Sequence, residues 1–155
     1  MFEENLPIFI GMAAITYWLG LEGFSRRNTP AFKVIELPSE SELDQLKEVA
    51  DKLDQLMGGK LLYKNPNLSL KELAEHAEVK PYMVSRTFSL LLDTKFNDYV
   101  NGYRLQALRE LLQDPEKRKL TLLGLAYEVG FNSKASFNRA TLKLTGKSPK
   151  HLLQE

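Results

Sequence analysis

Two segments of this chain repeat one pattern, and that repeat limits the possible folds more than any other feature of the sequence. Ser69 precedes a short stretch of apolar residues at helical spacing, a break follows, and Pro81 opens a second short stretch. Further along the chain, Thr121 and Ser133 occupy the corresponding starting positions. Serine and threonine cap helices, and proline is tolerated as a first helical residue because its missing N–H is not needed there. Each segment is therefore predicted to form two short helices.

Small residues stand where the two helices of each unit must approach closely. Ala74 lies in the first predicted helix of one unit, and Ala126 lies 52 residues later at the corresponding position of the other. Gly130 follows in a turn that can require a positive φ angle, which glycine adopts freely. Two short helices joined by a tight turn make a helix-turn-helix. The repeat therefore predicts two such units, at about residues 68–92 and 119–146.

Long helices are predicted around and between the two units. Residues 96–112 carry apolar side chains at helical spacing, and Asp114-Pro115 ends the stretch. At the helical rise this segment is about 25 Å long. Successive major-groove faces on one side of DNA lie ~34–36 Å apart, so a long rigid helix is expected to hold two small readers in adjacent grooves. Residues 39–57 form another helix, and no strand-like alternation follows it. The expected fold is all-α: two helix-turn-helix subdomains joined by a long linker helix, preceded by an apolar N-terminal helix.

The start of the chain is an uncharged stretch with two open interpretations. Asn5 to Leu21 contains no charged residue, and Arg26 and Arg27 follow it. One interpretation is a membrane helix at residues 5–24, anchored in the inner membrane with the rest of the chain in the cytoplasm. The other is a helix that covers an apolar patch on the domain or on a second copy, giving a homodimer, through Ile8, Phe9, Ile15, Trp18 and Leu19. The expected layout is a helix at 1–24, a linker at 25–38 and a domain at 39–155.

Charge and composition narrow the function. Residues 1–59 carry 5 Lys/Arg against 10 Asp/Glu, whereas residues 60–155 carry 16 against 10. The basic half is the candidate partner for a polyanion. The chain has no cysteine and only His76 and His151, so we predict no metal site and no cofactor. It contains no G-x-S-x-G, GxGxxG or P-loop motif, so we predict that it is not an enzyme and has no catalytic residues.

Polar side chains near the start of each second helix are the candidates for DNA contact, because a recognition helix reads base edges with these residues. Arg86 and Arg139 can pair with guanine and Asn138 with adenine, although each arginine can instead bridge to a carboxylate of the linker helix. The candidate DNA-binding residues are Lys80, Tyr82, Met83, Ser85, Arg86 and Ser89, then Asn132, Ser133, Lys134, Ser136, Asn138 and Arg139. The candidate phosphate contacts are Lys95, Arg104, Lys143 and Lys147; each can equally be an ordinary surface charge.

Three motifs resemble the AraC/XylS-type regulators. These are GFNSKASFNR at 130–139, TGKSP at 145–149 and FNDYVNGYRL at 96–105, and the resemblance covers roughly residues 43–153. It implies a seven-helix domain with two subdomains, with recognition helices at Pro81–Leu91 and Lys134–Leu144. The chain departs from the family pattern at Glu78 and Asp93, where glycine is frequent. It also departs at Thr141 and Leu142, where phenylalanine and a basic residue are usual.

The resemblance also implies a function and partners. It implies a sequence-specific transcription regulator that reads two adjacent major grooves of double-stranded DNA, with RNA polymerase as a further partner. The apolar N-terminal segment is similar to that of membrane-tethered relatives, in which a sensor precedes the regulator. Two alternatives stay open: a helical protein–protein interaction module without DNA contact, and the output domain of a larger membrane sensor. A protein-docking groove would carry apolar anchors where both units carry polar, basic edges.

Overall fold

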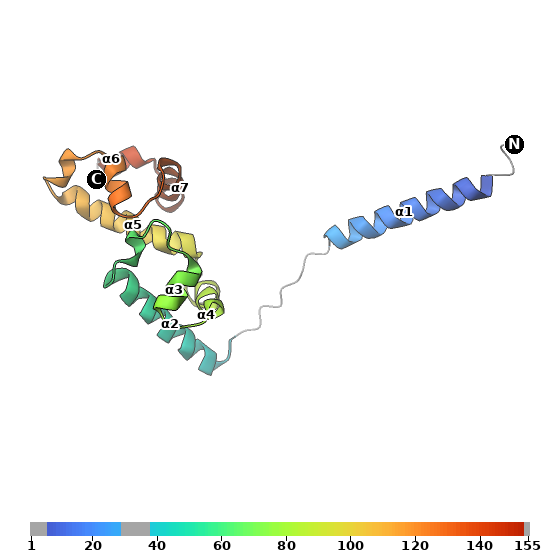
Figure 1. The fold of residues 1–155 in the computed structure, drawn as a ribbon, viewed down its shortest axis with the longest axis horizontal. Helices are drawn as coiled ribbons and strands as arrows, with labels where there is room; N and C mark the ends of the chain where they lie inside the picture. Colours follow the sequence, from blue (N-terminus) through green and yellow to red (C-terminus); the bar gives the residue numbers. More distant parts are fainter. Residues whose placement is uncertain (1–5, 29–37, 154–155) are drawn as a thin grey trace. The chain divides into compact units, whose positions relative to one another are not determined.

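The computed structural model describes residues 6–28 and 38–153, which fall into two units, Met1–Leu37 and Pro38–Glu155. The described residues form helices and turns, and no strand occurs among them. The predicted all-α class is therefore confirmed. Figure 1 shows the helices of each unit, coloured along the chain from blue to red.

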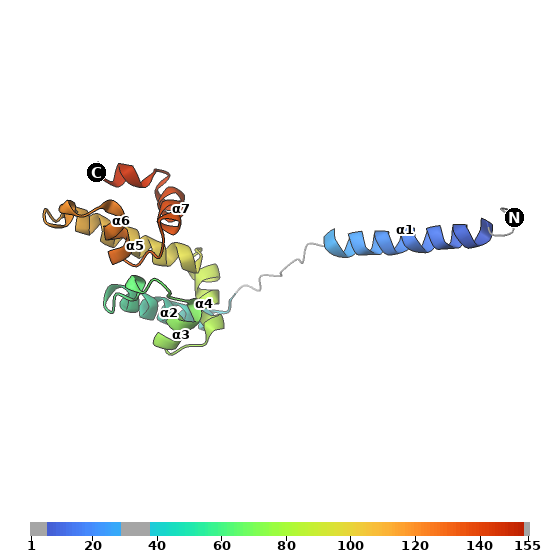
Figure 2. The same ribbon diagram turned by 45° about the horizontal axis from the view of Figure 1, so that its top comes forward.

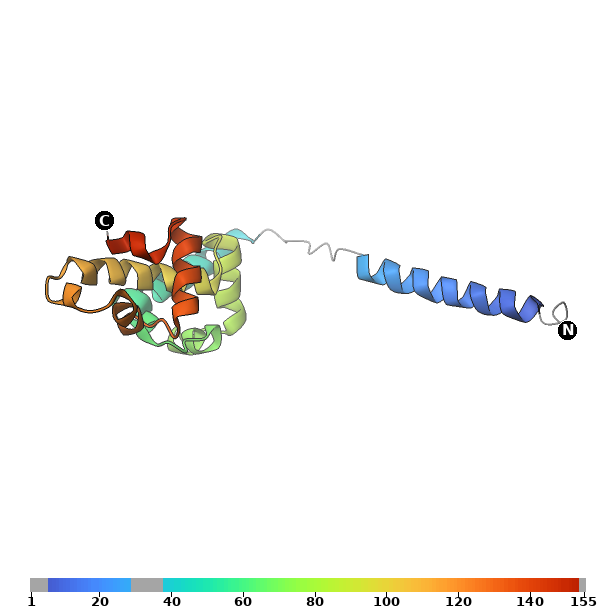
Figure 3. The ribbon, with the colours of Figure 1, turned by 90° about the horizontal axis from the view of Figure 1, so that it is seen from above.

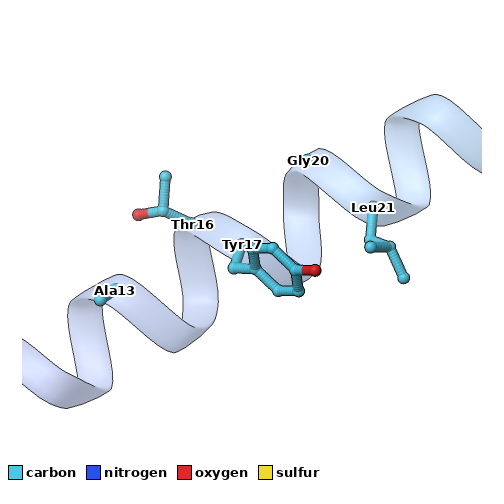
Figure 4. A pocket seen from close by; sticks show the side chains of 5 residues that line it. All are labelled: Ala13, Thr16, Tyr17, Gly20 and Leu21. Carbon is cyan, nitrogen blue, oxygen red and sulfur yellow. The ribbon is translucent and has the colours of Figure 1, made fainter.

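The N-terminal unit contains one helix, α1, at Leu6–Asn28. Between Ile10 and Leu21 its apolar side chains are exposed within this unit, and Figure 4 shows a shallow hollow on one side, where Ala13 and Gly20 leave room beside Tyr17. A hollow formed by residues of a single helix cannot enclose a ligand. The exposed apolar residues are Ile10, Met12, Ile15, Tyr17, Trp18, Leu19 and Leu21.

The prediction of a membrane helix is not supported. Within the two described ranges, no helix combines the length and the apolar character that a membrane crossing requires. Asn5 lies outside the described residues, as do the side chains of Ile8, Phe9, Arg26 and Arg27, on which parts of that prediction depended.

The second unit opens with α2, at Glu40–Gly58, as the sequence predicts. The Ser39 hydroxyl accepts the backbone N–H of Glu42 at 3.2 Å, which satisfies one of the free donors at the helix start. One face of α2 is buried, including Leu46 and Leu53. A short helix that the sequence did not predict, η1 at Leu62–Lys64, follows Leu61, whose φ is 53°.

The first helix-turn-helix consists of α3 at Leu70–His76 and α4 at Pro81–Arg86. The Ser69 hydroxyl caps α3 by accepting the N–H of Glu72 at 3.1 Å, and Pro81 is the first residue of α4. The chain stays helical beyond α4 through a wider π-type turn, η2, at Thr87–Leu91. The predicted helix over 81–91 is thus present, but its second half is unwound relative to an α-helix.

The linker helix and the second helix-turn-helix complete the unit. The linker helix, α5, spans Phe96–Gln113 and ends at Asp114, as predicted. The second helix-turn-helix pairs α6 at Leu122–Glu128 with α7 at Lys134–Thr145. Thr121 caps α6 and Ser133 caps α7, as predicted, by accepting N–H groups at 3.0 and 3.1 Å. Two short helices, η3 at Lys117–Lys119 and η4 at Pro149–Leu153, lie before α6 and after α7.

Helix α5 takes part in two separate hydrophobic cores. Its residue Val100 packs in the first core, with α2, α3 and α4. Its residues Leu105 and Leu108 pack in the second core, with α6 and α7. Figure 2 shows α5 running between the two groups of helices. Each helix-turn-helix is therefore fixed to a different part of the same helix.

Two tyrosines join α5 to α2 at the edge of the first core. The hydroxyls of Tyr99 and Tyr103 donate to the same Asp54 oxygen, at 2.5 and 2.9 Å. Burial raises the pKa of Tyr99, and the hydrogen bond to Asp54 raises it further. Both phenols are neutral at physiological pH, so they can act as donors to this carboxylate.

The positions that depart from the family pattern have clear structural consequences. Glu78 and Asp93 have φ angles of 56° and 43°, in the left-handed region that glycine adopts without strain. Thr141 is fully buried, and its hydroxyl donates to the Phe137 carbonyl at 2.9 Å, so no buried polar group is left unpaired there. Leu142 is exposed on α7.

Candidate nucleic-acid interface

The second helices of the two units, α4 and α7, point in the same general direction. Figure 1 views both close to end-on, with the start of α5 between them, and Figure 3 shows both lengthwise, from their first residues toward their last. Each begins with residues that have exposed polar side chains, which are Lys80 and Tyr82 for α4 and Asn132 and Lys134 for α7. The starts of α4 and α7 therefore lie on the same side of the domain (Figure 3).

In the first helix-turn-helix, some of the candidate side chains are exposed and others make contacts within the protein. Lys80, Tyr82, Ser85 and Ser89 are exposed along α4 and η2. Met83 is partly buried and packs against the first core, so it is less available for contact.

Arg86 is engaged within the protein. Its Nη2 lies 2.6 Å from Oε1 of Glu42, and its Nε is buried without a hydrogen-bond partner among the described residues. The sequence allowed a bridge between this arginine and a carboxylate of the linker helix. A bridge exists, but its partner is on α2 rather than on α5.

In the second helix-turn-helix, the exposed candidates are Asn132, Lys134, Asn138 and Arg139. The two serines instead organise the helix start. Ser133 is the cap, and the Ser136 hydroxyl lies 2.8 Å from the Ser133 carbonyl and 3.0 Å from Oδ1 of Asn132.

Of the four predicted phosphate contacts, Lys95, Lys143 and Lys147 are exposed, and Arg104 is not. Lys143 forms an ion pair with Asp98 at 2.6 Å. The guanidinium of Arg104 donates from Nε to the Tyr63 carbonyl and from Nη2 to the Asn65 carbonyl, both at 2.8 Å. Burial lowers the pKa of Arg104 to about 10, which still leaves it charged at neutral pH. A buried guanidinium committed to two carbonyls is inconsistent with the predicted phosphate contact.

Arg104 instead helps to hold the second helix-turn-helix against the first, a role that sequence reasoning missed. Its guanidinium carbon lies 5.5 Å from the centre of the ring of Phe131, which lies in the turn of the second helix-turn-helix. Next to Phe131, Gly130 has a φ of 101°, and a Cβ there would be 2.4 Å from the Tyr63 carbonyl oxygen. The available signal was position: Arg104 lies four residues after Val100 and four before Leu108, on the buried face of α5.

A polar groove lies between the first half of α5, the loop at 66–68 and one side of α7. Its volume is about 540 Å³. Predicted contact residues from α7 form one wall of it, and amide side chains form much of the remainder. The polar and charged lining residues are Asn67, Asn97, Asp98, Asn101, Arg104, Asn132, Ser136, Arg139 and Lys143. We refer to this feature as the central groove.

Residues 73–155, more than half of the chain, match a protein family described as a helix-turn-helix domain. The HTH-type transcriptional regulator CdhR of Pseudomonas aeruginosa is 32% identical over 89 residues, which are 57% of this chain and 26% of that relative. The chain therefore spans about a quarter of the length of the curated relative that it matches.

Two solved structures share the fold. A protein of unknown function from Listeria innocua superposes with a TM-score of 0.55 at 25% identity, covering 68% of this chain and 94% of that one. The C-terminal domain of AraT, a response regulator from Geobacillus stearothermophilus, gives a TM-score of 0.56 at 23% identity, covering 69% and 84%. With the family match over both recognition segments and two helix-turn-helix units on one linker helix, the chain belongs to the AraC/XylS-type helix-turn-helix family.

Proposed function

We propose that this chain is a sequence-specific DNA-binding transcription regulator, with residues 39–155 as its DNA-binding domain. The observation that carries the proposal is the common direction of α4 and α7, with α5 beginning between them. Helix α5 has 18 residues and is about 27 Å long. Such a support suits two recognition helices that enter adjacent major grooves on one face of a duplex.

Base recognition falls to the exposed polar side chains of both helices. Tyr82 and Ser85 on α4, and Asn138 and Arg139 on α7, are exposed. Arginine pairs with guanine and asparagine with adenine through two hydrogen bonds each, which is the main source of direct sequence reading in the major groove. Arg86 contributes to this reading only when it leaves Glu42.

The partners in this proposal are double-stranded DNA, RNA polymerase and a second copy of the chain, and DNA binding takes place in the cytoplasm. RNA polymerase follows from the family. The second copy is included because α1 has exposed apolar residues on all sides, such as Ile15, Trp18 and Leu19, and such a helix is ordinarily buried. Sedimentation of the full chain, compared with a version that lacks residues 1–33, tests this part.

Selection of bound duplexes from a random pool tests the DNA proposal. We expect enriched sequences with two conserved blocks about one helical turn apart. We also expect the logarithm of the affinity to fall with the logarithm of the salt concentration, by about 0.9 for each phosphate contact. A pool without enrichment, together with affinity that does not respond to salt, would favour the protein-interaction alternative.

A further inference from the structure

We propose that the central groove binds phosphate oxygens of the DNA backbone between the two recognition helices. This proposal rests on the proposed function and adds a site to it. The new contacts are Asn67, Asn97 and Asn101, none of which is a predicted contact residue. The ligand chemistry is a phosphodiester anion, held mainly by neutral N–H donors.

Two of the four amides of the central groove, those of Asn101 and Asn132, are oriented by hydrogen bonds within the protein. Oδ1 of Asn101 accepts from Nη1 of Arg104 at 3.3 Å, and Oδ1 of Asn132 accepts from the Ser136 hydroxyl at 3.0 Å. In these two side chains the carbonyl oxygen accepts a hydrogen bond from within the protein, and the NH₂ group remains as a donor for a ligand. An NH₂ group pairs with an acceptor such as a phosphate oxygen.

The start of α5 adds backbone donors to the same groove. Phe96, Asn97 and Asp98 line the groove and form the first turn of this helix. The cap residue, Lys95, makes no side-chain hydrogen bond to the helix. The N–H of Asp98 donates to the Lys95 carbonyl at 2.9 Å, so the backbone donors that this helix start can offer are those of Phe96 and Asn97. They lie at the positive end of the helix dipole, where anions are favoured.

The balance of charge in the groove agrees with this chemistry. Its lining contains three cations, Arg104, Arg139 and Lys143, and one carboxylate, Asp98. The carboxylate is already paired with Lys143 at 2.6 Å. The groove therefore has an excess of positive charge that an anion can neutralise.

The position of the groove indicates DNA as the source of the phosphate. One wall is α7, whose Ser136 and Arg139 are among the predicted base-reading residues. Another wall is the start of α5, which lies between α4 and α7 (Figure 1). In this proposal, a duplex that contacts both recognition helices passes its backbone over this region. Asparagine side chains, backbone N–H groups and helix starts are among the donors that proteins use to contact DNA phosphates.

The substitution Asn97→Asp tests the groove because it should move stability and binding in opposite directions. An acidic residue in the first turn of α5 interacts favourably with the helix dipole, so the melting temperature should stay level or rise. The same change replaces a donor by a negative charge, so affinity for the selected duplex should fall about tenfold or more. Gln106→Glu is the matched control for affinity, since it adds the same charge to an exposed position of α5 outside the groove. Its melting temperature should fall slightly, because it replaces the hydrogen bond from Gln106 to Glu110 by two like charges.

The second measurement replaces single phosphates of the selected duplex by neutral methylphosphonates. With the unsubstituted full chain, neutral groups midway between the two conserved blocks should weaken binding, and Asn97→Asp should remove that sensitivity. Equal losses for Asn97→Asp and Gln106→Glu, or tolerance of every central methylphosphonate, would overturn the proposal.

Two further outcomes identify what has failed. If inorganic phosphate alone shifts the side-chain NMR signals of Asn97 and Asn101 while central methylphosphonates are tolerated, the groove holds a free anion and DNA is the wrong source. If the unsubstituted chain selects no duplex, the proposed function itself fails, and the groove proposal fails with it. If the chain selects a duplex but shows no central phosphate contact, only the groove proposal is overturned.

Discussion

The guanidinium of Arg86 is held 2.6 Å from the carboxylate of Glu42, so the first recognition helix is tied to α2 through a residue that could also contact DNA. The tie is incomplete, because the Nε of Arg86 is buried without a partner among the described residues. Both side chains are about a third exposed, so solvent screens their attraction. The ion pair is therefore expected to contribute little to stability.

Glu42→Gln should release Arg86. We expect a loss of stability of less than about 1 kcal/mol, as for other partly exposed ion pairs, and an affinity for DNA that rises several-fold. Denaturant titration and fluorescence anisotropy with the selected duplex measure the two effects. Glu48→Gln is the control, because it removes the same charge from the same helix, where Glu48 pairs with Lys52. If both variants gain affinity equally, the gain reflects net charge and Arg86 has a purely structural role.

Gly130→Ala should destabilise the protein severely. A Cβ at Gly130 would be 2.4 Å from the Tyr63 carbonyl oxygen, and φ is 101°, so both contact and conformation oppose it. We expect a loss of about 3 kcal/mol or more, as for other backbone-incompatible substitutions. Gly102→Ala is the matched control, because nothing lies within 4 Å of its Cβ position in α5. That variant should gain about 0.5–1 kcal/mol, and equal behaviour of the two would contradict the packing described here.

Glycine at Glu78 or Asp93 should stabilise the protein. Both residues have positive φ angles, 56° and 43°, which cost an L-residue roughly 1–2 kcal/mol. Part of the relief is offset by the greater freedom of glycine in the unfolded chain, so we expect about 0.5–1 kcal/mol from each substitution. Chemical denaturation measures the change. Lys71→Gly, at an exposed position within α3, should lose about 1 kcal/mol and shows that the gain is specific to positive φ.

Asn138→Ala and Arg139→Ala should relax base preference as well as weaken binding. Each two-bond contact with a base is worth about 1–3 kcal/mol of discrimination. Repeating the duplex selection with each variant should show the loss of preference at one or two positions. A uniform fall in affinity for all sequences would instead make these residues phosphate contacts or structural residues.

The helix boundaries could be predicted because they depend on local chemistry. Ser69, Thr121 and Ser133 each cap the helix that follows, and Gly130 has the positive φ expected of its turn. These features involve residues within a few positions of one another, so the order of residues is sufficient to predict them.

Contacts between distant segments could not be predicted in the same way. Arg104 donates to the carbonyls of Tyr63 and Asn65, about forty residues earlier in the chain. Every residue has a backbone carbonyl, so the sequence cannot show which ones accept. For Arg86 the type of partner was predictable but its identity was not, since several carboxylates were available. The central groove is likewise formed by three separated segments, and only the fold brings its asparagines together.

Because α5 supplies side chains to both hydrophobic cores, neither subdomain has a complete interior without it. If the first subdomain alone unfolded, the half of α5 that carries Val100 would lose its cover while the other half stayed packed around Leu108. Partial unfolding is thus penalised, and the two subdomains should melt in a single cooperative transition despite their separate cores. Damage to either core then lowers the population of molecules in which both recognition helices are in place.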